Sequence, residues 1–162
     1  MYKFKIGDYV LYGVSGACEV VDIGKLEFGS NDKIYYTLQP YYDSRDKIYV
    51  PVDREAEIIR KVIEKKEAEK LLPTIKKSKR KGKMPAREEC DVILKSGDMD
   101  NVTNLIRQLR EVKHENKKNH KSLNIADAKM LTYAERMLFS EMAIAMGWTM
   151  DQAVEELSEC LG

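Results

Sequence analysis

The sequence predicts an α+β protein, in which a small β-barrel precedes a bundle of about four to five helices. Short runs rich in aromatic and β-branched residues, separated by turn-forming residues, fill the first fifty positions. Apolar residues at helical spacing dominate the second half of the chain. Between them lies KKSKRKGK, in which six of eight residues are Lys or Arg. These features predict a barrel (residues 1–62), a helix with a basic linker (63–85) and a helical domain (86–162).

Four strands are predicted, at residues 9–12, 17–23, 33–38 and 47–50. Turn signals separate them, and a hairpin turn explains Gly13 and Gly16 better than a phosphate-binding loop or a nucleophile elbow. Four or five strands in about 55 residues cannot form two full sheets, but they can curl into a barrel that leaves little exposed edge. The stretch IIRKVI, at residues 58–63, fits either a last strand or a helix.

The first helix is predicted over residues 64–72, which are nearly all strong helix formers, and Pro73 is expected to end it. Pro85 is expected at the first position of the next helix. Gly97 then acts as a C-terminal cap, and Asp98 as the N-cap of the helix that follows.

The last two helices have clear ends in the sequence. Asn124 is predicted to cap a long helix, and Gly147 is predicted to end it. Thr149 and Gln152 form the capping-box pattern at the start of a final helix. Trp148 precedes that cap, where it fits a hydrophobic staple.

Composition and residue spacing exclude several classes of protein. No apolar run approaches the ~18 residues of a membrane span, and the first residues lack a secretory apolar core, so we expect a soluble, cytoplasmic protein. Three widely spaced cysteines and two histidines six positions apart match no disulfide framework or metal site. No catalytic constellation is visible, so we expect neither an enzyme nor a cofactor.

Positive charge is concentrated in the middle of the chain. Residues 54–83 hold 12 basic and 5 acidic side chains, a balance of +7, against −2 before them and −4 after them. A second basic set recurs every three to four residues on the predicted helix after Met99, and comprises Arg107, Arg110, Lys113 or His114, Lys117 and Lys121. Either set could be a solvated surface or tether, but two basic elements in one small domain would suit a phosphate backbone.

Four stretches together resemble the CarD/CdnL family of bacterial transcription regulators. They are FKIGDYVLYGVSGACEVVDI (residues 4–23), YVPVDREAEIIRKVI (49–63), LKSGD (94–98) and LNIADAKMLTYAERMLFSEMAIAMG (123–147). The resemblance covers nearly the whole chain in the right order. The N-terminal part is also similar to the polymerase-interacting module of the transcription-repair coupling factor.

The resemblance implies a function and a set of sites. It implies a Tudor-like barrel that binds the RNA polymerase β subunit. We also expect a monomeric protein that associates with the nucleoid. The resemblance also implies a helical domain that contacts promoter DNA at the melted region and stabilises the open complex. Residues 57–60 should then end the barrel as a strand. The predicted polymerase contacts are Lys25, Lys47, Tyr49 and Tyr36, and the predicted DNA contacts are Lys79, Arg80, Lys81, Lys83, Met84, Arg107 and Arg110.

The sequence departs from the family at two positions. Family members carry a Trp that wedges into the minor groove, and counting back from LKSGD places it near Lys83, where no aromatic residue lies. Met84-Pro85 could replace that wedge, or the wedge could be lost. A basic residue that is common in the family before the Val-Pro dipeptide is Tyr49 here, and Lys47 is the nearest replacement.

Two other functions stay open at this point. One is a protein adaptor that binds polymerase but not DNA. The other is an RNA- or ribosome-binding protein, because small barrels followed by basic segments also occur in that class.

Overall fold

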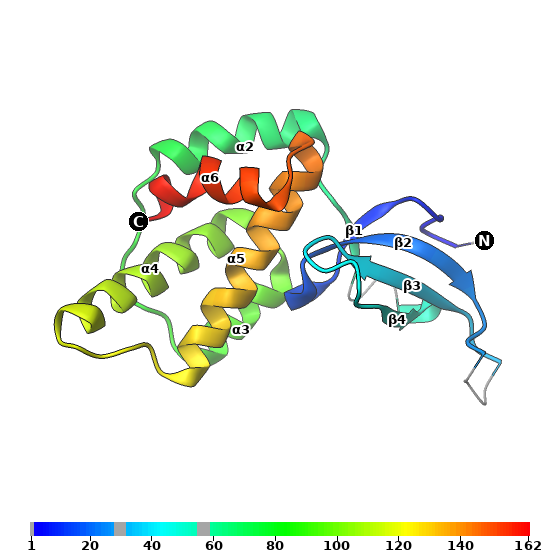
Figure 1. Cartoon of the computed structure of the whole chain (residues 1–162), viewed down its shortest axis with the longest axis horizontal. Helices are drawn as coiled ribbons and strands as arrows, with labels where there is room; N and C mark the ends of the chain where they lie inside the picture. The colour runs from blue at the N-terminus through cyan, green and yellow to red at the C-terminus, as the bar shows by residue number, and fades with distance from the viewer. Residues whose placement is uncertain (1, 28–31, 55–58) are drawn as a thin grey trace.

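The computed structural model describes residues 2–27, 32–54 and 59–162, in which a curled antiparallel half-barrel precedes five α-helices (Figure 1). The predicted α+β class is therefore confirmed. The sheet has the order β4-β3-β2-β1-β5, so that β4 and β5 lie at its two ends. The strands are β1 (Tyr9–Leu11), β2 (Ala17–Gly24), β3 (Tyr35–Pro40), β4 (Ile48–Pro51) and β5 (Arg60–Lys61).

The hairpin between β1 and β2 forms where the glycines predicted it. Leu11 pairs with Ala17, and the Tyr12 N–H donates to the Gly16 carbonyl at 3.0 Å. Gly16 has a φ of 73°, a conformation that side chains with a Cβ rarely adopt. The inward side chains of the strands, such as Val20 and Leu38, form a small core that is separate from the helical core.

The ambiguous stretch 58–63 contains a short strand. Arg60 and Lys61 pair with Leu11 and Val10 of β1, so the strand implied by the family resemblance is found at Arg60 but extends to Lys61 and does not include Ile59. Residues 57 and 58 of the predicted strand lie outside the described residues. The helix follows four residues after Lys61, with Glu64 at its N-cap.

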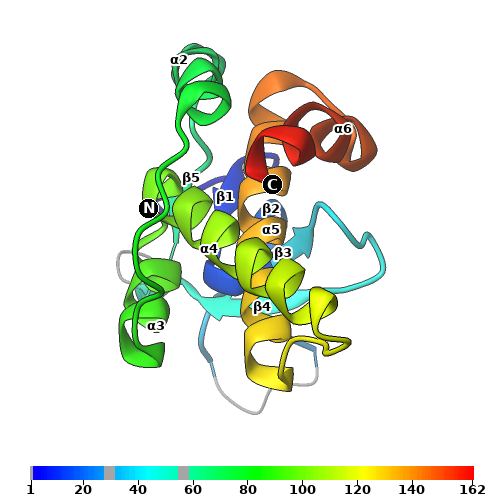
Figure 2. The same ribbon diagram turned by 90° about the vertical axis from the view of Figure 1, so that its left-hand side faces the viewer.

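The helices are α2 (Lys65–Lys77), α3 (Arg87–Ser96), α4 (Met99–Lys118), α5 (Ile125–Met146) and α6 (Met150–Leu161). Helix α5 packs against α2, α3, α4 and α6, and also against β1, β2 and the single turn η1 (Gly13–Ser15) of the half-barrel. It therefore belongs to the bundle and at the same time forms the face on which the barrel sits; in Figure 2, which is viewed from the bundle end, α5 lies in front of the strands.

The predicted helix caps are confirmed. Gly97 and Gly147 have left-handed φ values of 66° and 74°. Asp98 accepts hydrogen bonds from the backbone N–H groups of Asp100 and Asn101. Asn124 caps α5, and Thr149 and Gln152 form a complete capping box. These agreements follow from the short range of capping interactions, which involve residues at most four positions apart.

Two helix boundaries were predicted wrongly. Pro73 does not end α2, which continues to Lys77. The cost of proline inside the helix is offset by packing further along, because Ile75 is buried in the helical core. Pro85 is not the first residue of α3, because Ala86 is still extended and the helix starts at Arg87.

Candidate functional site

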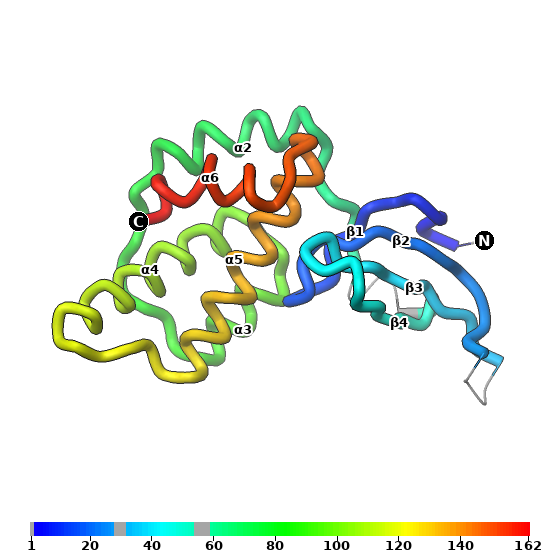
Figure 3. Tube along the Cα trace, in the orientation of Figure 1, coloured from blue at the N-terminus to red at the C-terminus, as the bar shows by residue number. Residues whose placement is uncertain are grey.

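The basic run folds onto the helical domain as a strap. We define the basic strap as residues 76–83, which comprise the end of α2 and the extended segment after it. Figure 3 traces this segment along α4 on its way to α3. The segment is part of the folded helical layer, because α2 itself packs against α5 and α6.

Two amide side chains of α4 hold the strap backbone. Gln108 Nε2 donates to the carbonyls of Lys81 and Lys83, at 2.7 and 3.1 Å. Asn104 Nδ2 also donates to the Lys81 carbonyl, at 2.9 Å. Both amides are almost fully buried under the strap. The strap therefore satisfies polar groups on α4, and its own backbone position is set by the fold.

The six cations of the strap fall into two groups. Lys76, Arg80 and Lys81 each lie within 4 Å of a carboxylate of the helical domain, whereas Lys77, Lys79 and Lys83 form no ion pair within the part of the chain that the structure describes. All six side chains are exposed. The strap is thus a fixed backbone that carries solvent-facing positive charge.

Arg107 and Arg110, predicted as DNA contacts, lie inside the bundle instead. Arg107 is 4% exposed and donates to the Ile75 carbonyl, and its burial lowers the pKa of the guanidinium. Arg110 donates to Glu135 at 2.7 Å and to the Ser158 carbonyl at 3.0 Å. These two arginines connect α4 to its neighbours, so the predicted basic stripe does not form one exposed face.

The geometry argues against a wedge role for Met84. Its side chain is partly buried and packs against the helical core. The only tryptophan, Trp148, packs against the same core, and its carbonyl accepts a hydrogen bond from the Tyr41 hydroxyl at 2.8 Å. Trp148 therefore packs against the helical core, and its role as a hydrophobic staple for the last helix stays a prediction.

The predicted polymerase contacts divide into buried and exposed residues. Tyr36 cannot contribute to a docking surface as predicted, because its ring is fully buried and lies edge-on to Phe4 in the barrel core. Lys47 and Tyr49 are exposed at the β4 end of the sheet. Lys25 is exposed after β2, where it lies 3.5 Å from Asp32. The β4 end of the described sheet thus presents an exposed tyrosine within the strand and an exposed lysine just before it.

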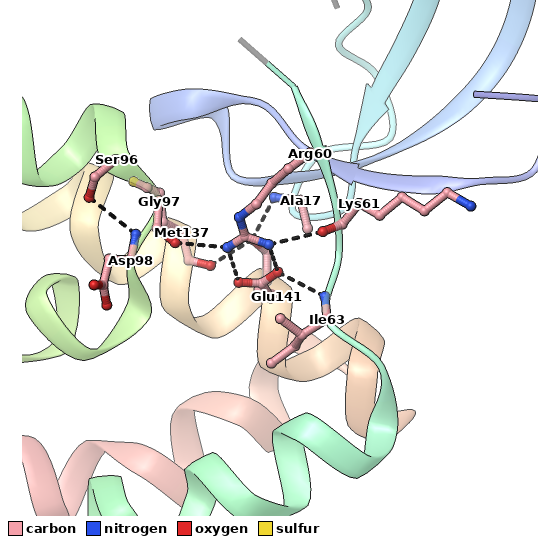
Figure 4. A network of polar contacts seen from close by, with 10 residues as sticks. Ala17, Arg60, Lys61, Ile63, Ser96, Gly97, Asp98, Met137 and Glu141 are labelled. Carbon is pink, nitrogen blue, oxygen red and sulfur yellow. Dashed lines mark hydrogen bonds and ion pairs between the residues drawn. The ribbon is translucent and has the colours of Figure 1, made fainter. Parts of the chain in front are cut away.

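A partly buried ion pair, in which only the glutamate is fully buried, joins the barrel to the bundle, and sequence reasoning did not identify it. Figure 4 shows Arg60 of β5 meeting Glu141 of α5 through two hydrogen bonds, at 2.6 and 2.7 Å. Arg60 also donates to the Gly97 carbonyl at 2.8 Å, and the Ile63 N–H donates to Glu141 at 3.1 Å. The Glu141 side chain is completely buried. A glutamate within the apolar run FSEMAIAMG was the available signal for this pair.

Close backbone contact completes this joint. The Ala17 N–H donates to Ser140 Oγ of α5 at 2.8 Å. A Cβ atom at Gly16 would lie only 2.7 Å from the same oxygen. Arg136 of α5 lies over the Tyr42 ring, 4.0 Å from its centre. We call Arg60, Glu141, Gly16, Ala17 and Ser140 the barrel–bundle joint, because together they set the orientation of the barrel on α5.

The described residues contain no group of three or more His, Cys, Asp or Glu side chains that could hold a metal ion. The three cysteines are free, and burial raises the pKa of the Cys18 thiol to about 12, as expected for a thiol used as a small apolar side chain. Across the ranges that the structure covers, every helix is too short or too polar to cross a bilayer.

Two protein-family models match the chain. The CarD-like/TRCF RID domain matches residues 4–63, and the CarD C-terminal domain matches residues 76–158. The first match covers the half-barrel and the second covers the strap and most of the remaining helices. A search of curated proteins found no match.

Proposed function

Because this chain belongs to the CarD-like family of RNA polymerase-interacting transcription regulators, we propose that it bridges RNA polymerase and promoter DNA. In this proposal the half-barrel docks on the β subunit of the polymerase, and the basic strap contacts DNA phosphates beside the melted region. The two contacts together stabilise the open complex. The family is one of non-enzymatic regulators, so the proposed action is binding alone.

The observation that carries this proposal is the fixed backbone of the strap. The amides of Asn104 and Gln108 hold the carbonyls of Lys81 and Lys83, so the strap is ordered before any ligand arrives. Binding to a pre-ordered segment loses less conformational entropy than binding to a flexible tether. The exposed cations Lys77, Lys79 and Lys83 are then available to phosphate oxygens.

The β4 end of the half-barrel supports the polymerase contact. Tyr49 is 39% exposed there, and tyrosine contributes a large contact area at little cost in conformational entropy. Lys47 adds an exposed charge just before the strand. This surface replaces the one predicted from sequence, which included the buried Tyr36.

The barrel–bundle joint supports the bridging geometry. A bidentate ion pair to the buried Glu141 and a close backbone contact hold the barrel on α5. Docking of the barrel would therefore also set the position of the strap relative to the polymerase. A flexible connection would not constrain where the strap meets the DNA.

The DNA contact is tested by titrating promoter DNA with variants at different salt concentrations. Lys79→Gln with Lys83→Gln should reduce the slope of log affinity against log salt by about 1.8, since each lost phosphate contact changes it by about 0.9. The control, Lys65→Gln with Lys66→Gln, removes the same charge from the exposed start of α2. Equal effects of the two double variants, or no salt dependence in the original protein, would exclude the strap as the DNA contact.

The polymerase contact is tested by capture of the purified β subunit on the tagged full-length protein. Lys47→Glu with Tyr49→Ala should abolish capture, whereas Lys5→Glu, on an exposed loop of the same half-barrel, should leave it intact. Retained capture by the double variant would place the docking surface elsewhere.

A second candidate function is a polymerase-bound adaptor without a DNA contact. It is favoured by the ion pairs that already engage Lys76, Arg80 and Lys81. This function would be supported if the protein captured the β subunit but its affinity for promoter DNA did not change with salt concentration.

A further inference from the structure

We infer that three carboxylates of the helical domain, Asp100, Glu111 and Glu156, compete with DNA phosphates for the basic strap. They would hold the affinity of the strap for free DNA below the level that its charge allows. This inference rests on the proposed DNA contact and concerns how that contact is regulated.

The three carboxylates come from two helices and approach the strap from its flanks. Arg80 Nη1 lies 2.9 Å from Asp100 of α4, Lys81 Nζ lies 3.4 Å from Glu111 of α4, and Lys76 Nζ lies 3.6 Å from Glu156 of α6. Asn101 adds an acceptor for Arg80 at 3.1 Å. Six cations with three carboxylates beside them leave a local charge of +3.

These ion pairs have the exposure needed for exchange. Each of the six side chains is between 46% and 57% exposed, so water reaches both partners. Exposed pairs are individually weak and are screened by salt. Phosphate and carboxylate oxygens offer an arginine the same kind of charge-assisted hydrogen bond. A DNA phosphate can therefore replace each carboxylate while Asn104 and Gln108 continue to hold the strap backbone.

The competition has a consequence for where the strap acts. Free DNA must displace the carboxylates at its bulk concentration, so the strap alone should bind it weakly. Once the barrel is docked on polymerase, promoter DNA lies beside the strap at a high effective concentration, and exchange becomes favourable. The carboxylates would thus weaken the DNA contact of the free protein and favour that contact in the polymerase-bound protein.

The test is a double-mutant cycle measured with a fluorescent promoter duplex and the full chain at low salt. Asp100→Asn should bind the duplex about two- to fivefold more tightly than the original protein, and so should Glu111→Gln. Arg80→Gln combined with Asp100→Asn should bind no more tightly than Arg80→Gln alone, because the partner of Asp100 is then absent. Thermal unfolding of every variant verifies that the amide replacements leave the fold intact.

Glu115→Gln is the matched control. Glu115 lies on the same helix, but it pairs with Lys118, 3.3 Å away on α4, and not with the strap. The inference would be overturned if Glu115→Gln gave a similar gain in DNA affinity, or if the gain from Asp100→Asn persisted in the Arg80→Gln background. Either result would show that the gain comes from the change in overall charge and not from the release of a strap cation. Unchanged affinity for Asp100→Asn and Glu111→Gln would also overturn it. If the original protein and all variants fail to bind duplex DNA, the proposed DNA contact itself fails.

Discussion

The barrel–bundle joint and the basic strap both depend on ion pairs and hydrogen bonds with the helical domain, but the carboxylates of the two regions differ strongly in their exposure to water. At the joint, the Glu141 side chain is completely buried, and the hydrogen bonds that it accepts from the described residues come from β5 or from Ile63 just after it. At the strap, the paired side chains are about half exposed. The same chemistry therefore serves two purposes in one small protein.

The difference in burial determines which contacts can be exchanged. A buried charge that loses its partner keeps its desolvation cost, so the Arg60–Glu141 pair does not open without a large penalty. An exposed carboxylate that loses its partner is simply rehydrated. The joint is suited to holding a geometry, whereas the side chains of the strap are suited to binding a ligand.

The largest expected effect comes from breaking the joint. Arg60→Ala should lower the free energy of unfolding by about 3–5 kcal/mol, because it leaves the buried Glu141 without its cation. Equilibrium unfolding in urea measures this change. The adjacent Lys61 is the control: its side chain is 65% exposed and lies 4.0 Å from Asp8. Lys61→Ala should change stability by at most about 0.5 kcal/mol. Equal effects of the two variants would show that the ion pair to the buried Glu141 adds no more stability than an exposed pair.

A smaller effect is expected from the backbone contact within the joint. Gly16→Ala should cost about 2–3 kcal/mol, since it forces a Cβ into a left-handed conformation and against Ser140 Oγ. Gly13→Ala should cost only about 1 kcal/mol, because Gly13 also has a positive φ but open space around it. Thermal unfolding measures the stability of the two variants, and the difference between them gives the cost of the close contact with Ser140 beyond that of backbone strain. A smaller loss of stability for Gly16→Ala than for Gly13→Ala would contradict this contact.

The smallest effect is expected where the strap meets α4. Gln108→Ala should cost about 1 kcal/mol, because it removes the donors to the Lys81 and Lys83 carbonyls but leaves Asn104 in place. Hydrogen exchange of the strap amides should become faster, while exchange in the barrel should not change. Asn116→Ala is the control at the far end of the same helix. Unaltered exchange in the strap would mean that the amides of α4 do not hold it.

The elements with local signals were predictable from residues a few positions apart. The β1–β2 turn needed only Gly13 and Gly16, and the helix ends needed only caps such as Asp98 and Asn124. The concentration of charge in residues 76–83 was likewise visible as composition. Each of these features depends on interactions within one turn of the chain.

The features that were missed depend on distant neighbours. Pro73 lies inside α2 because Ile75 finds a buried position beyond it. Arg107 looks like a solvent-facing cation from its helical phase, yet α2 covers it and accepts its hydrogen bond. Tyr36 looks like a surface aromatic, but its strand phase turns it into the barrel core. In each case packing against a segment distant in the sequence decides the outcome, which is where a helix ends or whether a side chain is buried.

The sequence by itself determined the fold class, most of the element boundaries and the place where positive charge accumulates, because short-range propensities and capping operate within a few residues. Only the tertiary structure decided which cations face solvent, which carboxylates accompany them, and that Arg60 meets Glu141 across 81 positions of the chain. The physical reason is that burial and desolvation are properties of the packed chain, and they set the strength of every ion pair.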